Sequence, residues 1–460
     1  MRHDAIVVGG GPGGYVAAIR MGQLGLKVGL VEEGALGGVC LNWGCVPTKA
    51  LYSATRLVAQ ASRAAGAGIE FGAPAIDLLR LAAWKEGIVS RLAGGIVSLL
   101  KQNGVTLFPA RGTLAGPGRV VLATGETLES ERVVLATGSS PVEIPGFPFS
   151  HSRVWSSDDA LALREVPARL LVVGAGVVGL ELATIYRRLG SEVAVVEMMG
   201  DVLPGLDLDA RTLALVRRAQ GTLGIALHLN AAAESFEETS SGLAVRLRSG
   251  ERLEAERVLV AVGRRPNSSG IGLETAGISP DRRGFVPVDS CLKTTAPGVW
   301  AIGDLVPGPM LAHKASAEGV RVAGSFAGED VPLDYEAIPQ AVFTDPEVAS
   351  VGLSEARAKE KGHETVVGRF PYAALGKALG MGETEGFFQV VGEKGTGRLL
   401  GVQIVGAEAS DLISEAALAV QSRLTLSQIA DAVHPHPTLP EGLKEAAENA
   451  LGRAIHTVNR

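Results

Sequence analysis

The chain opens with an apolar segment, a cluster of glycines, a run of small residues and a second apolar segment: AIVVGGGPGGYVAAIRMGQLGLKVGLVEEG, residues 5–34. An apolar run before a glycine cluster is typical of a buried parallel strand, and the small-residue run after it suits a helix. The same pattern returns in residues 169–200, RLLVVGAGVVGLELATIYRRLGSEVAVVEMMG. We therefore predict two strand–helix–strand units of one kind.

The pattern between and after these units predicts the remaining elements. Residues 52–108 are expected to be largely helical, and residues 118–141, GRVVLATGETLESERVVLATGSSP, to form strands. A similar passage, LEAERVLVAVGRRPN, closes the second unit. A strand in KTTAPGVWAIGDL, residues 293–305, precedes a helix that begins near MLAHKASAEG. From about residue 337 the pattern predicts an antiparallel sheet with later helices, and no nucleotide motif.

Both predicted units carry the spacing Gly-x-Gly-x-x-Gly after the first strand and an acidic residue at the end of the second. These residues are Gly9, Gly11, Gly14 and Glu32 in the first unit and Gly174, Gly176, Gly179 and Glu197 in the second. Such glycines allow a tight turn and close approach to a pyrophosphate at a helix N-terminus, and the acid binds a ribose hydroxyl. The first glycine and the acidic residue are 23 residues apart in both units, from 9 to 32 and from 174 to 197. Glycine-rich turns without this role would have to arrive at the same spacing twice. We therefore expect two dinucleotide sites.

Composition and charge exclude several classes of function. The 460 residues suggest about three domains. A net charge of −6 provides no basic surface for nucleic acid and no polybasic membrane anchor. We find no apolar stretch of about 18 or more residues, so we expect no membrane span. Three cysteines in this length indicate a reducing compartment, and the cytoplasm is the expected location.

Two of the three cysteines, Cys40 and Cys45, lie in GGVCLNWGCVPTKAL, residues 37–51. A zinc site would need a second Cys or His pair, which is absent, so we expect no metal. In a regular helix, Cα atoms five residues apart are about 8 Å apart, beyond the roughly 4.4–6.8 Å of a disulfide. Asn42 and Gly44 permit the distortion that a disulfide would require, and Pro47 suits the first turn of a helix.

Cys45 is therefore expected at a helix N-terminus, where the helix dipole stabilises a thiolate. Two interpretations of the pair stay open: small buried side chains, which is the commoner role of a cysteine, or a redox-active pair. The glycines, Pro47 and Lys49 around the cysteines favour the redox pair. Cys291 stands alone and is expected to be a small buried side chain.

Taken together, these segments resemble the class I flavin-dependent pyridine nucleotide-disulfide oxidoreductases, and among them the enzymes that oxidise dihydrolipoamide. The resemblance runs from residue 4 to about residue 450. It is carried by both glycine fingerprints and by GGVCLNWGCVPTKAL, VVLATGS, GRRPN, WAIGDL, MLAHKA, FTDPEVASVG and HPHPTLPEGLKEA. It implies an α/β protein with two Rossmann-like dinucleotide-binding domains and a C-terminal α+β dimerisation domain. The implied domains are residues 1–145 and 267–336 for FAD, 146–266 for NAD and 337–460 for the dimer interface.

The resemblance implies tightly but non-covalently bound FAD, with NAD as a co-substrate. The implied FAD contacts are Gly9, Gly11, Gly14, Glu32, Lys49, Thr137, Gly138, Asp304, Ala312 and His313. The implied NAD contacts are Gly174, Gly176, Gly179, Glu181, Glu197 and Gly263. Glu32 and Glu197 would each bind a ribose, and Asp304 would accept a hydrogen bond from the ribityl chain. Lys49 would lie beside the flavin and pair with Glu181.

The resemblance also implies a reaction in which the two cysteines have different roles. Cys40 would exchange with the dithiol substrate, and the Cys45 thiolate would lie against the flavin. His436 in HPHPTLPEGL would take the thiol proton, and Glu441 would orient its imidazole. Protein-bound dihydrolipoamide would be oxidised to lipoamide through a Cys40–Cys45 disulfide and FAD, and NAD would be reduced. Such enzymes are the third component of 2-oxo acid dehydrogenase and glycine cleavage complexes.

The partners that the resemblance implies are a second copy of the chain and the subunits of such complexes. In the implied homodimer, His436 and Glu441 of one subunit complete the partner's site. The other implied partners are lipoyl domains and the core or peripheral-subunit-binding domain of 2-oxo acid dehydrogenase complexes. Pro435, Pro440 and Gly442 depart from the family pattern beside the base, but they remove no functional group.

Three other functions have signatures that this chain lacks. A glutathione reductase would place arginines beside the second acid to bind a 2′-phosphate, and EMMGDVLP, residues 197–204, contains no basic residue. A mercuric reductase would carry adjacent cysteines near its C-terminus, whereas the last cysteine here is Cys291. A scaffold subunit without chemistry would not need both cysteines, the base and two nucleotide motifs.

Overall fold

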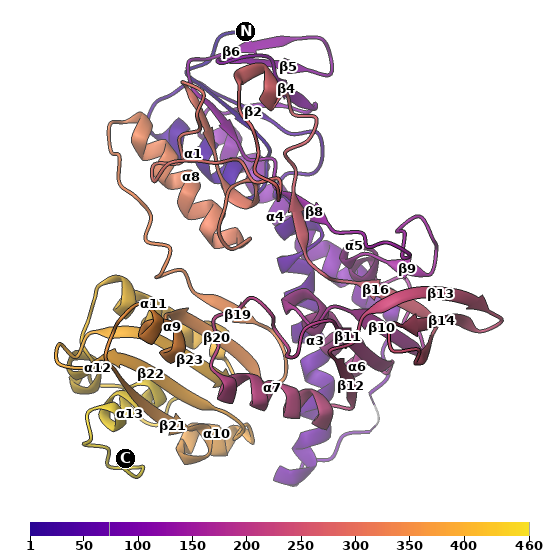
Figure 1. Cartoon of the computed structure of the whole chain (residues 1–460), viewed down its shortest axis with the longest axis vertical. Helices are drawn as coiled ribbons and strands as arrows, with labels where there is room; N and C mark the ends of the chain where they lie inside the picture. The colour runs from indigo at the N-terminus through magenta and orange to yellow at the C-terminus, as the bar shows by residue number, and fades with distance from the viewer. Residues whose placement is uncertain (73, 460) are drawn as a thin grey trace.

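The computed structural model describes residues 1–72 and 74–459, and three five-stranded sheets organise it. Figure 1 shows three parts, each built around one of these sheets: the first at the top of the view, the second at the lower right and the third at the lower left. The predicted α/β fold with a C-terminal α+β part is confirmed.

The first sheet is parallel, with the strand order β18-β7-β1-β2-β3. Its strands are β1 (Ala5–Val8), β2 (Val28–Val31), β3 (Thr106–Phe108), β7 (Val133–Leu135) and β18 (Val299–Ala301). Every residue of β1 and β2 is buried, which explains their unbroken apolar sequences. Because β18 pairs with β7, residues on both sides of the second unit build this part of the molecule.

Two helices lie side by side against the first sheet, α1 (Pro12–Gln23) and α8 (Ala312–Phe326) (Figure 1). A Cβ on Gly319 would lie 2.5 Å from the Gly13 carbonyl oxygen, so only glycine allows this close approach. The other elements of this part are α2 (Gly38–Asn42), α3 (Cys45–Arg63), α4 (Leu78–Gln102) and the antiparallel strands β4 (Gly112–Leu114), β5 (Arg119–Leu122) and β6 (Thr127–Glu129). The largely helical segment predicted for residues 52–108 is thus formed mainly by α3 and α4.

The second sheet is also parallel, with the order β12-β11-β10-β16-β9. Its strands are β9 (Val154–Trp155), β10 (Arg169–Val173), β11 (Glu192–Glu197), β12 (Ile225–Leu229) and β16 (Arg257–Val260). Around it lie α5 (Ser157–Ala162), α6 (Val177–Leu189), α7 (Ala210–Thr222) and the antiparallel strands β13 (Ala233–Thr239), β14 (Gly242–Leu247) and β15 (Arg252–Ala255). The strands β8 (Ser139–Pro141) and β17 (Arg264–Pro266) pair antiparallel, where the chain passes between the first and second parts.

The third sheet is antiparallel, with the order β19-β20-β23-β22-β21. Its strands are β19 (Gln340–Val342), β20 (Glu347–Gly352), β21 (Thr365–Pro371), β22 (Phe387–Glu393) and β23 (Leu399–Gly406). Its helices are α9 (Glu355–Glu360), α10 (Gly376–Met381), α11 (Ala409–Gln421), α12 (Leu426–Asp431) and α13 (Glu441–Ala450). Across the described parts of the chain, we find no helix long and apolar enough to cross a lipid bilayer.

The first part contains a buried histidine, His3, which gives a prediction about acid stability. Its side chain is 5% exposed and packs edge-on against Phe108, with ring centroids 5.5 Å apart. Burial lowers the pKa of His3 below its ordinary value of 6.5, with help from the charges of Lys27 and the N-terminus. The unfolded chain therefore binds a proton more readily than the folded chain does, so stability is lost as the pH falls from about 6.5 toward the folded-state pKa.

When the pH is lowered from about 7.5 to 5, we expect the melting temperature of the His3→Leu variant to fall by less than that of the wild-type protein. Melting temperatures of both proteins across this range test the expectation. His456→Gln is the matched control, because the His456 side chain is 67% exposed. Parallel pH profiles for the His3→Leu variant and the wild type would contradict the prediction.

Candidate active site

The first glycine cluster forms the turn between β1 and α1. Gly9 has a φ of +106°, and a Cβ there would lie 2.2 Å from the Ala136 carbonyl oxygen, so this position requires glycine. A Cβ on Gly14 would lie 1.8 Å from the Gly9 carbonyl oxygen. α1 begins after Gly11 without a side-chain cap, which leaves its first N–H groups for an anionic ligand.

The second cluster forms the same turn between β10 and α6. Gly174 has a φ of +109°, and a Cβ on Gly179 would lie 2.0 Å from the Gly174 carbonyl oxygen. α6 begins after Gly176, again without a side-chain cap. The two motifs that the sequence pattern paired are therefore built in the same way.

The acidic residues of the two units are also held alike. The Gly10 N–H donates to Glu32 Oε2 at 2.5 Å, and the Gly34 N–H donates to Oε1 of the same carboxylate at 2.7 Å. Glu197 accepts from the N–H groups of the equivalent residues in the second unit, at 2.8 Å each. Each carboxylate is thus fixed at the end of its strand, next to the glycine turn.

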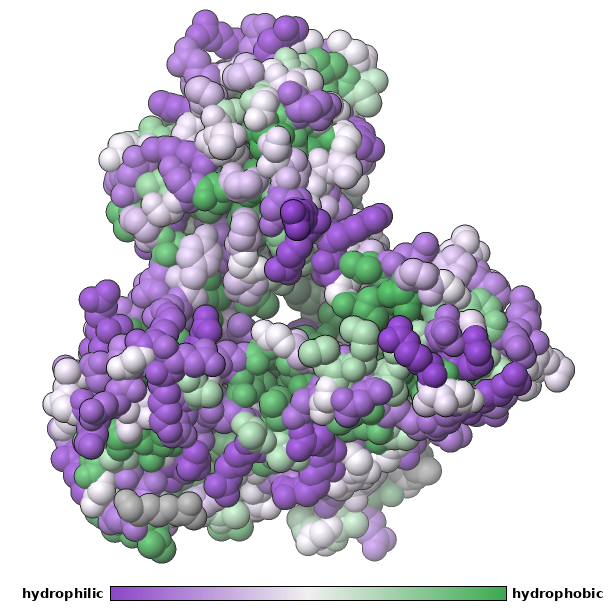
Figure 2. All heavy atoms as spheres, in the orientation of Figure 1, coloured by the Kyte–Doolittle hydropathy of each residue, from purple (hydrophilic) through white to green (hydrophobic). Residues whose placement is uncertain are grey.

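A cavity of about 630 Å³ lies where the three parts of the molecule meet. Figure 2 shows a hollow at the centre of this face of the molecule, with hydrophobic residues gathered beside it. The predicted site residues that line the cavity are Gly9, Gly11, Glu32, Cys40, Cys45, Lys49, Thr137, Gly138, Glu181, Asp304 and Ala312. Segments far apart in sequence, including residues 340–342 of the third part, therefore share one cavity.

Two residues of the implied FAD set lie outside the lining of this cavity. Gly14 lies beneath the turn, where its missing Cβ admits the Gly9 carbonyl. His313 is exposed, and its Nε2 lies 2.8 Å from the Pro339 carbonyl oxygen. Ala312, one residue earlier, lines the cavity, because successive residues of a helix point in different directions.

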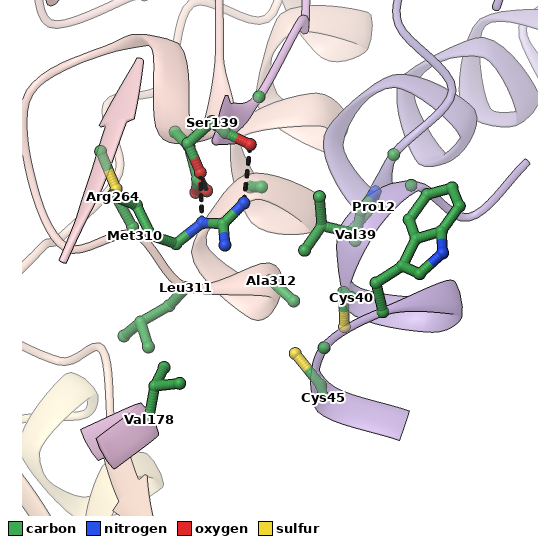
Figure 3. Close-up of a pocket in the computed structure, with 18 of the residues that line it drawn as sticks. Pro12, Val39, Cys40, Cys45, Ser139, Val178, Arg264, Met310, Leu311 and Ala312 are labelled. Atoms are coloured by element: carbon green, nitrogen blue, oxygen red, sulfur yellow. Dashed lines mark hydrogen bonds between the residues drawn. The ribbon is translucent and has the colours of Figure 1, made fainter. Parts of the chain in front are cut away.

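The cavity also holds polar residues that sequence patterns did not single out. Ser139 Oγ donates to Asp304 Oδ2 at 2.5 Å, and Arg264 Nε donates to Ser139 Oγ at 2.7 Å. Figure 3 shows the Arg264 side chain bonded twice to Ser139, through its Oγ and its carbonyl oxygen. Both residues stood inside the quoted segments VVLATGS and GRRPN. Their contact arises from the antiparallel pairing of β8 with β17.

The two cysteines lie at the junction of α2 and α3. α2 ends at Asn42, and α3 begins at Cys45, so Trp43 and Gly44 break the helix between them. The predicted distortion is therefore present, and Cys45 is the first residue of its helix. Figure 3 shows the Cys40 and Cys45 sulfurs turned toward one another at the cavity wall. Both thiols are free, with Cys40 half-buried and Cys45 exposed to the cavity.

The two thiols differ in acidity. The hydrogen bond with the Cys40 thiol is the main cause that lowers the pKa of Cys45 to about 7, against the effect of burial and with help from the Lys49 ammonium. The same hydrogen bond and burial raise the pKa of Cys40. Cys45 is therefore the more acidic thiol of the reduced pair and forms a thiolate before Cys40 as the pH rises.

Lys49 lies one turn beyond Cys45 and forms an ion pair with Glu181 of α6. Its Nζ is 2.9 Å and 3.1 Å from the two carboxylate oxygens. The Glu181 side chain is 4% exposed, whereas that of Lys49 is 32% exposed, so the carboxylate is held away from solvent and the ammonium is partly open to it. Glu181, which the resemblance placed among the NAD contacts, lines the first cavity and not the second.

A second cavity of about 720 Å³ lies beside the second glycine turn. Gly174, Gly176, Glu197 and Gly263 line it, and Gly179 lies beneath the turn. Five residues line both cavities, namely Ser157, Val177, Val178, Pro204 and Arg264. Because the cavities meet at these residues, groups bound in the two sites can approach each other.

The second cavity also receives a basic residue that the local sequence around Glu197 did not reveal. Arg248 lines the cavity, although it lies about fifty residues after Glu197, in the turn after β14. Its backbone N–H donates to the Ala232 carbonyl oxygen at 2.8 Å, which holds this turn against the cavity.

His436 and Glu441 form a bonded pair in the third part of the molecule. His436 Nδ1 lies 2.9 Å from Glu441 Oε1, and the Thr438 N–H donates to Glu441 Oε2 at 2.7 Å. The carboxylate is thus fixed, and it orients the imidazole. The His436 side chain is 79% exposed, and His436 is not among the described residues that line the first cavity. His436 and the two cysteines therefore do not meet within one chain.

The two sites fit dinucleotides on structural grounds. In each, glycines make room for the close approach of a ligand, uncapped helix N–H groups face the turn, and a fixed carboxylate ends the next strand. The first cavity adds the thiol pair and the Lys49–Glu181 pair. This combination suits a flavin nucleotide in the first site and a pyridine nucleotide in the second.

Comparison with known proteins agrees with this arrangement. The pyridine nucleotide-disulphide oxidoreductase family matches residues 3–319, and the dimerisation domain of that family matches residues 338–447. A dihydrolipoyl dehydrogenase of Halobacterium salinarum is 46% identical, over 99% of this chain and 98% of the relative. One of Thermus scotoductus is 47% identical, over 100% and 99%.

Among solved structures, the crystal structure of LpdA from Mycobacterium tuberculosis superimposes with a TM-score of 0.90. It is 30% identical, and the match covers 96% of this chain and 99% of LpdA. The family match extends over most of the chain, and the fold agrees with it. The chain therefore belongs to the pyridine nucleotide-disulphide oxidoreductase family.

Proposed function

We propose that this protein oxidises protein-bound dihydrolipoamide to lipoamide and reduces NAD, with FAD between them. The observation that carries this proposal is that a thiol pair and two candidate nucleotide sites meet. Cys40 and Cys45 line the first cavity, and this cavity shares five lining residues with the cavity beside Glu197. Curated relatives named dihydrolipoyl dehydrogenase, at 46–47% identity over nearly the full length, support this choice of substrate.

The FAD that we assign to the first site would accept an electron pair from the thiol pair and pass it to NAD as hydride. The chain's own residues perform the dithiol exchange. His436 removes a proton from one substrate thiol, and the thiolate attacks Cys40 Sγ of the oxidised pair. The Cys40–Cys45 bond breaks, a substrate–Cys40 disulfide forms, and Cys45 leaves as a thiolate. The second substrate thiol then attacks the sulfur of this disulfide that belongs to the substrate, which releases lipoamide and the Cys40 thiol.

The acidity of Cys45 favours this sequence. A leaving thiolate departs faster when its pKa is low, and the pKa of Cys45 is lowered to about 7. The position of Cys45 at the first residue of α3 adds the stabilising effect of the helix dipole. Cys40 therefore suits the role of the attacked sulfur, and Cys45 the role of the leaving sulfur.

The match to the family's dimerisation domain supports a homodimer. We propose that in this dimer His436 and Glu441 of one subunit reach the cysteine cavity of the other. This proposal is supported by the strong exposure of His436 and of the neighbouring Val433, which is 96% exposed.

The remaining roles and partners follow from the same proposal. The substrate dithiol would arrive on the lipoyl domain of another protein, and the core or peripheral-subunit-binding domain of a 2-oxo acid dehydrogenase complex would hold the dimer. The cytoplasm is the proposed location, because a redox-cycling disulfide suits a reducing compartment. Asp304 and Thr137 would contact FAD, and Glu197 would contact the adenosine ribose of NAD.

A kinetic comparison of substrates tests the proposed reaction. The FAD-loaded protein should form NADH from NAD when supplied with dihydrolipoamide, and a lipoylated domain should be a better substrate than free dihydrolipoamide. Glutathione disulfide with NADPH serves as the matched alternative pair. Faster turnover of this second pair would contradict the proposal and favour a glutathione reductase.

The second cavity also predicts the choice of nucleotide. The Glu197 carboxylate is fixed by two backbone N–H groups and would repel a 2′-phosphate at a cost of several kcal/mol, so kcat/KM should favour NAD over NADP by about a hundredfold or more. Initial rates with both nucleotides measure this ratio. Glu197→Ala combined with Met198→Arg should lower it, whereas Arg248→Ala should leave NAD preferred. Similar efficiencies with both nucleotides in the wild type would contradict the prediction.

A further inference from the structure

The Lys49 ammonium has a second neighbour besides Glu181. Its Nζ lies 4.5 Å from the centroid of the Phe343 ring, within the range of an attractive cation–π contact. The Phe343 backbone N–H also donates to Glu181 Oε1 at 3.0 Å. One residue of the third part of the molecule therefore contacts both members of the ion pair, one through its ring and the other through its main chain.

The Phe343 ring is itself held in place. It meets the Tyr52 ring edge-on, with centroids 5.6 Å apart and planes at 81°. The Tyr52 hydroxyl donates to the carbonyl oxygen of Thr344 at 2.8 Å, so the next residue in the chain fixes the aromatic partner. Tyr52 and Lys49 both belong to α3, the helix that begins at Cys45. The contact therefore joins the helix of the reactive cysteine to the segment after β19 (Gln340–Val342).

Phe343 lies outside the reactive cavity. It is half-buried, and it is not among the described residues that line either cavity, although residues 340–342 line the first. A ligand in the first cavity would therefore meet Lys49 and Glu181 but not Phe343. The Lys49–Glu181 pair is therefore a direct link between Phe343 and the cavity.

We propose that Phe343 is a positioning residue that holds the Lys49 ammonium against Glu181 and beside the Cys40–Cys45 pair. The ring supplies a negative face on one side of the ammonium, and the N–H of the same residue orients the carboxylate on the other side. The fixed positive charge then favours the thiolate form of Cys45. This inference rests on the proposed redox role of the two cysteines.

The charged and titratable groups that influence Cys45 come from three helices. Cys40 belongs to α2, Lys49 to α3 and Glu181 to α6. Lys49 favours the thiolate, whereas Glu181 opposes it, so the net influence depends on how the carboxylate and the ammonium are arranged. Arg188 lies over the Tyr52 ring, 4.8 Å from its centroid, and forms an ion pair with Asp345 at 2.8 Å.

A packing role alone would need only an apolar side chain at position 343. Leucine and methionine keep the hydrophobic character and the backbone N–H but remove the ring, whereas tyrosine keeps all three. Comparison of Phe343→Leu with Phe343→Tyr therefore separates the ring's electrostatic role from packing. Phe343→Met gives the same comparison if the leucine variant does not fold.

The test uses the FAD-loaded protein in a Cys40→Ser background, where Cys45 is the thiol at the site. The rate of Cys45 labelling by iodoacetamide is measured against pH, with mass spectrometry to separate Cys45 from Cys291. This readout requires no turnover, so it is independent of substrate identity. Lys49→Met in the same background is the reference for loss of the ammonium. Phe326→Leu is the matched control, because that ring meets another cation, Arg132, at 5.1 Å.

We expect Phe343→Leu to shift the labelling profile toward alkaline pH, in the direction of Lys49→Met, with a roughly two- to fivefold lower rate near pH 7. Phe343→Tyr and Phe326→Leu should keep the profile of the background protein. An unchanged profile for Phe343→Leu, or an equal shift for Phe343→Leu and Phe343→Tyr, would overturn the inference. Wild-type turnover of dihydrolipoamide is measured separately, so failure of the proposed function and failure of this inference are distinguishable.

Discussion

Replacing Cys45 by serine should reduce dihydrolipoamide oxidation by at least about a thousandfold, because the variant can form no Cys40–Cys45 disulfide to accept electrons from the dithiol. Cys40→Ser should cause a loss of the same size for the same reason. Residues that act as one unit have non-additive effects. The activity of the double variant should therefore lie within a small factor of the activity of either single variant. Steady-state formation of NADH with FAD-loaded proteins measures all three.

The two single variants should differ in their spectra. Cys40→Ser keeps the Cys45 sulfur at the N-terminus of α3 beside Lys49, so it should show long-wavelength charge-transfer absorbance that rises with pH as the Cys45 thiol ionises. Cys45→Ser should lack this absorbance, because we assign the contact with the flavin to the Cys45 sulfur. The opposite pattern would reverse the roles that we assign to the two sulfurs.

Cys291→Ser provides the matched control for both cysteine variants and should retain near-normal turnover. The sequence predicted a small buried side chain at this position, but Cys291 is only half-buried. Its backbone N–H donates to Asp289 Oδ1 at 2.9 Å in a turn, and it lines neither cavity. The exposure was unpredictable because a lone cysteine in a loop carries no periodic pattern.

Local rules made the nucleotide turns predictable from sequence. At Gly9 and Gly14 a Cβ would lie within 2.2 Å of a carbonyl oxygen, so the fold excludes every other residue type there. The break before Cys45 was predictable for a similar reason, because Asn42 and Gly44 tolerate the backbone that a regular helix forbids. Such constraints act over a few residues, and a motif records them directly.

Contacts between distant segments could not be derived in this way. Ser139 and Arg264 are 125 residues apart and meet only because β8 pairs with β17. Arg248 reaches the second cavity from a hairpin that no motif marks. His313 shows the converse, since it belongs to the same quoted motif as Ala312 but is not among the described residues that line the cavity. A motif identifies a segment, and only the fold decides which of its side chains face the site.

The position of His436, the base that we propose, leads to the second prediction of large effect. His436 follows Cys40 by almost four hundred residues, is 79% exposed and lies outside the cysteine cavity of its own chain. His436→Gln should reduce turnover by about 10²- to 10⁴-fold, the usual contribution of a general base. If His436 acts within its own chain, no combination of inactive subunits can restore activity, because every site keeps one lesion.

Mixing subunits decides whether the base acts on the partner's cysteines. We combine an inactive Cys45→Ser chain with an inactive His436→Gln chain and allow the subunits to exchange. A twofold interface is self-complementary, so each mixed dimer then contains one intact site and one site with both lesions. Activity should reappear toward half of the wild-type value per mixed dimer. In the control, the Cys45→Ser chain is mixed with a chain that carries both Cys45→Ser and His436→Gln. No dimer in this mixture contains an intact site. Absence of activity in verified mixed dimers of the two single variants would exclude a shared site, since a shared site would join the cysteines of the His436→Gln chain to the intact His436 of the other chain.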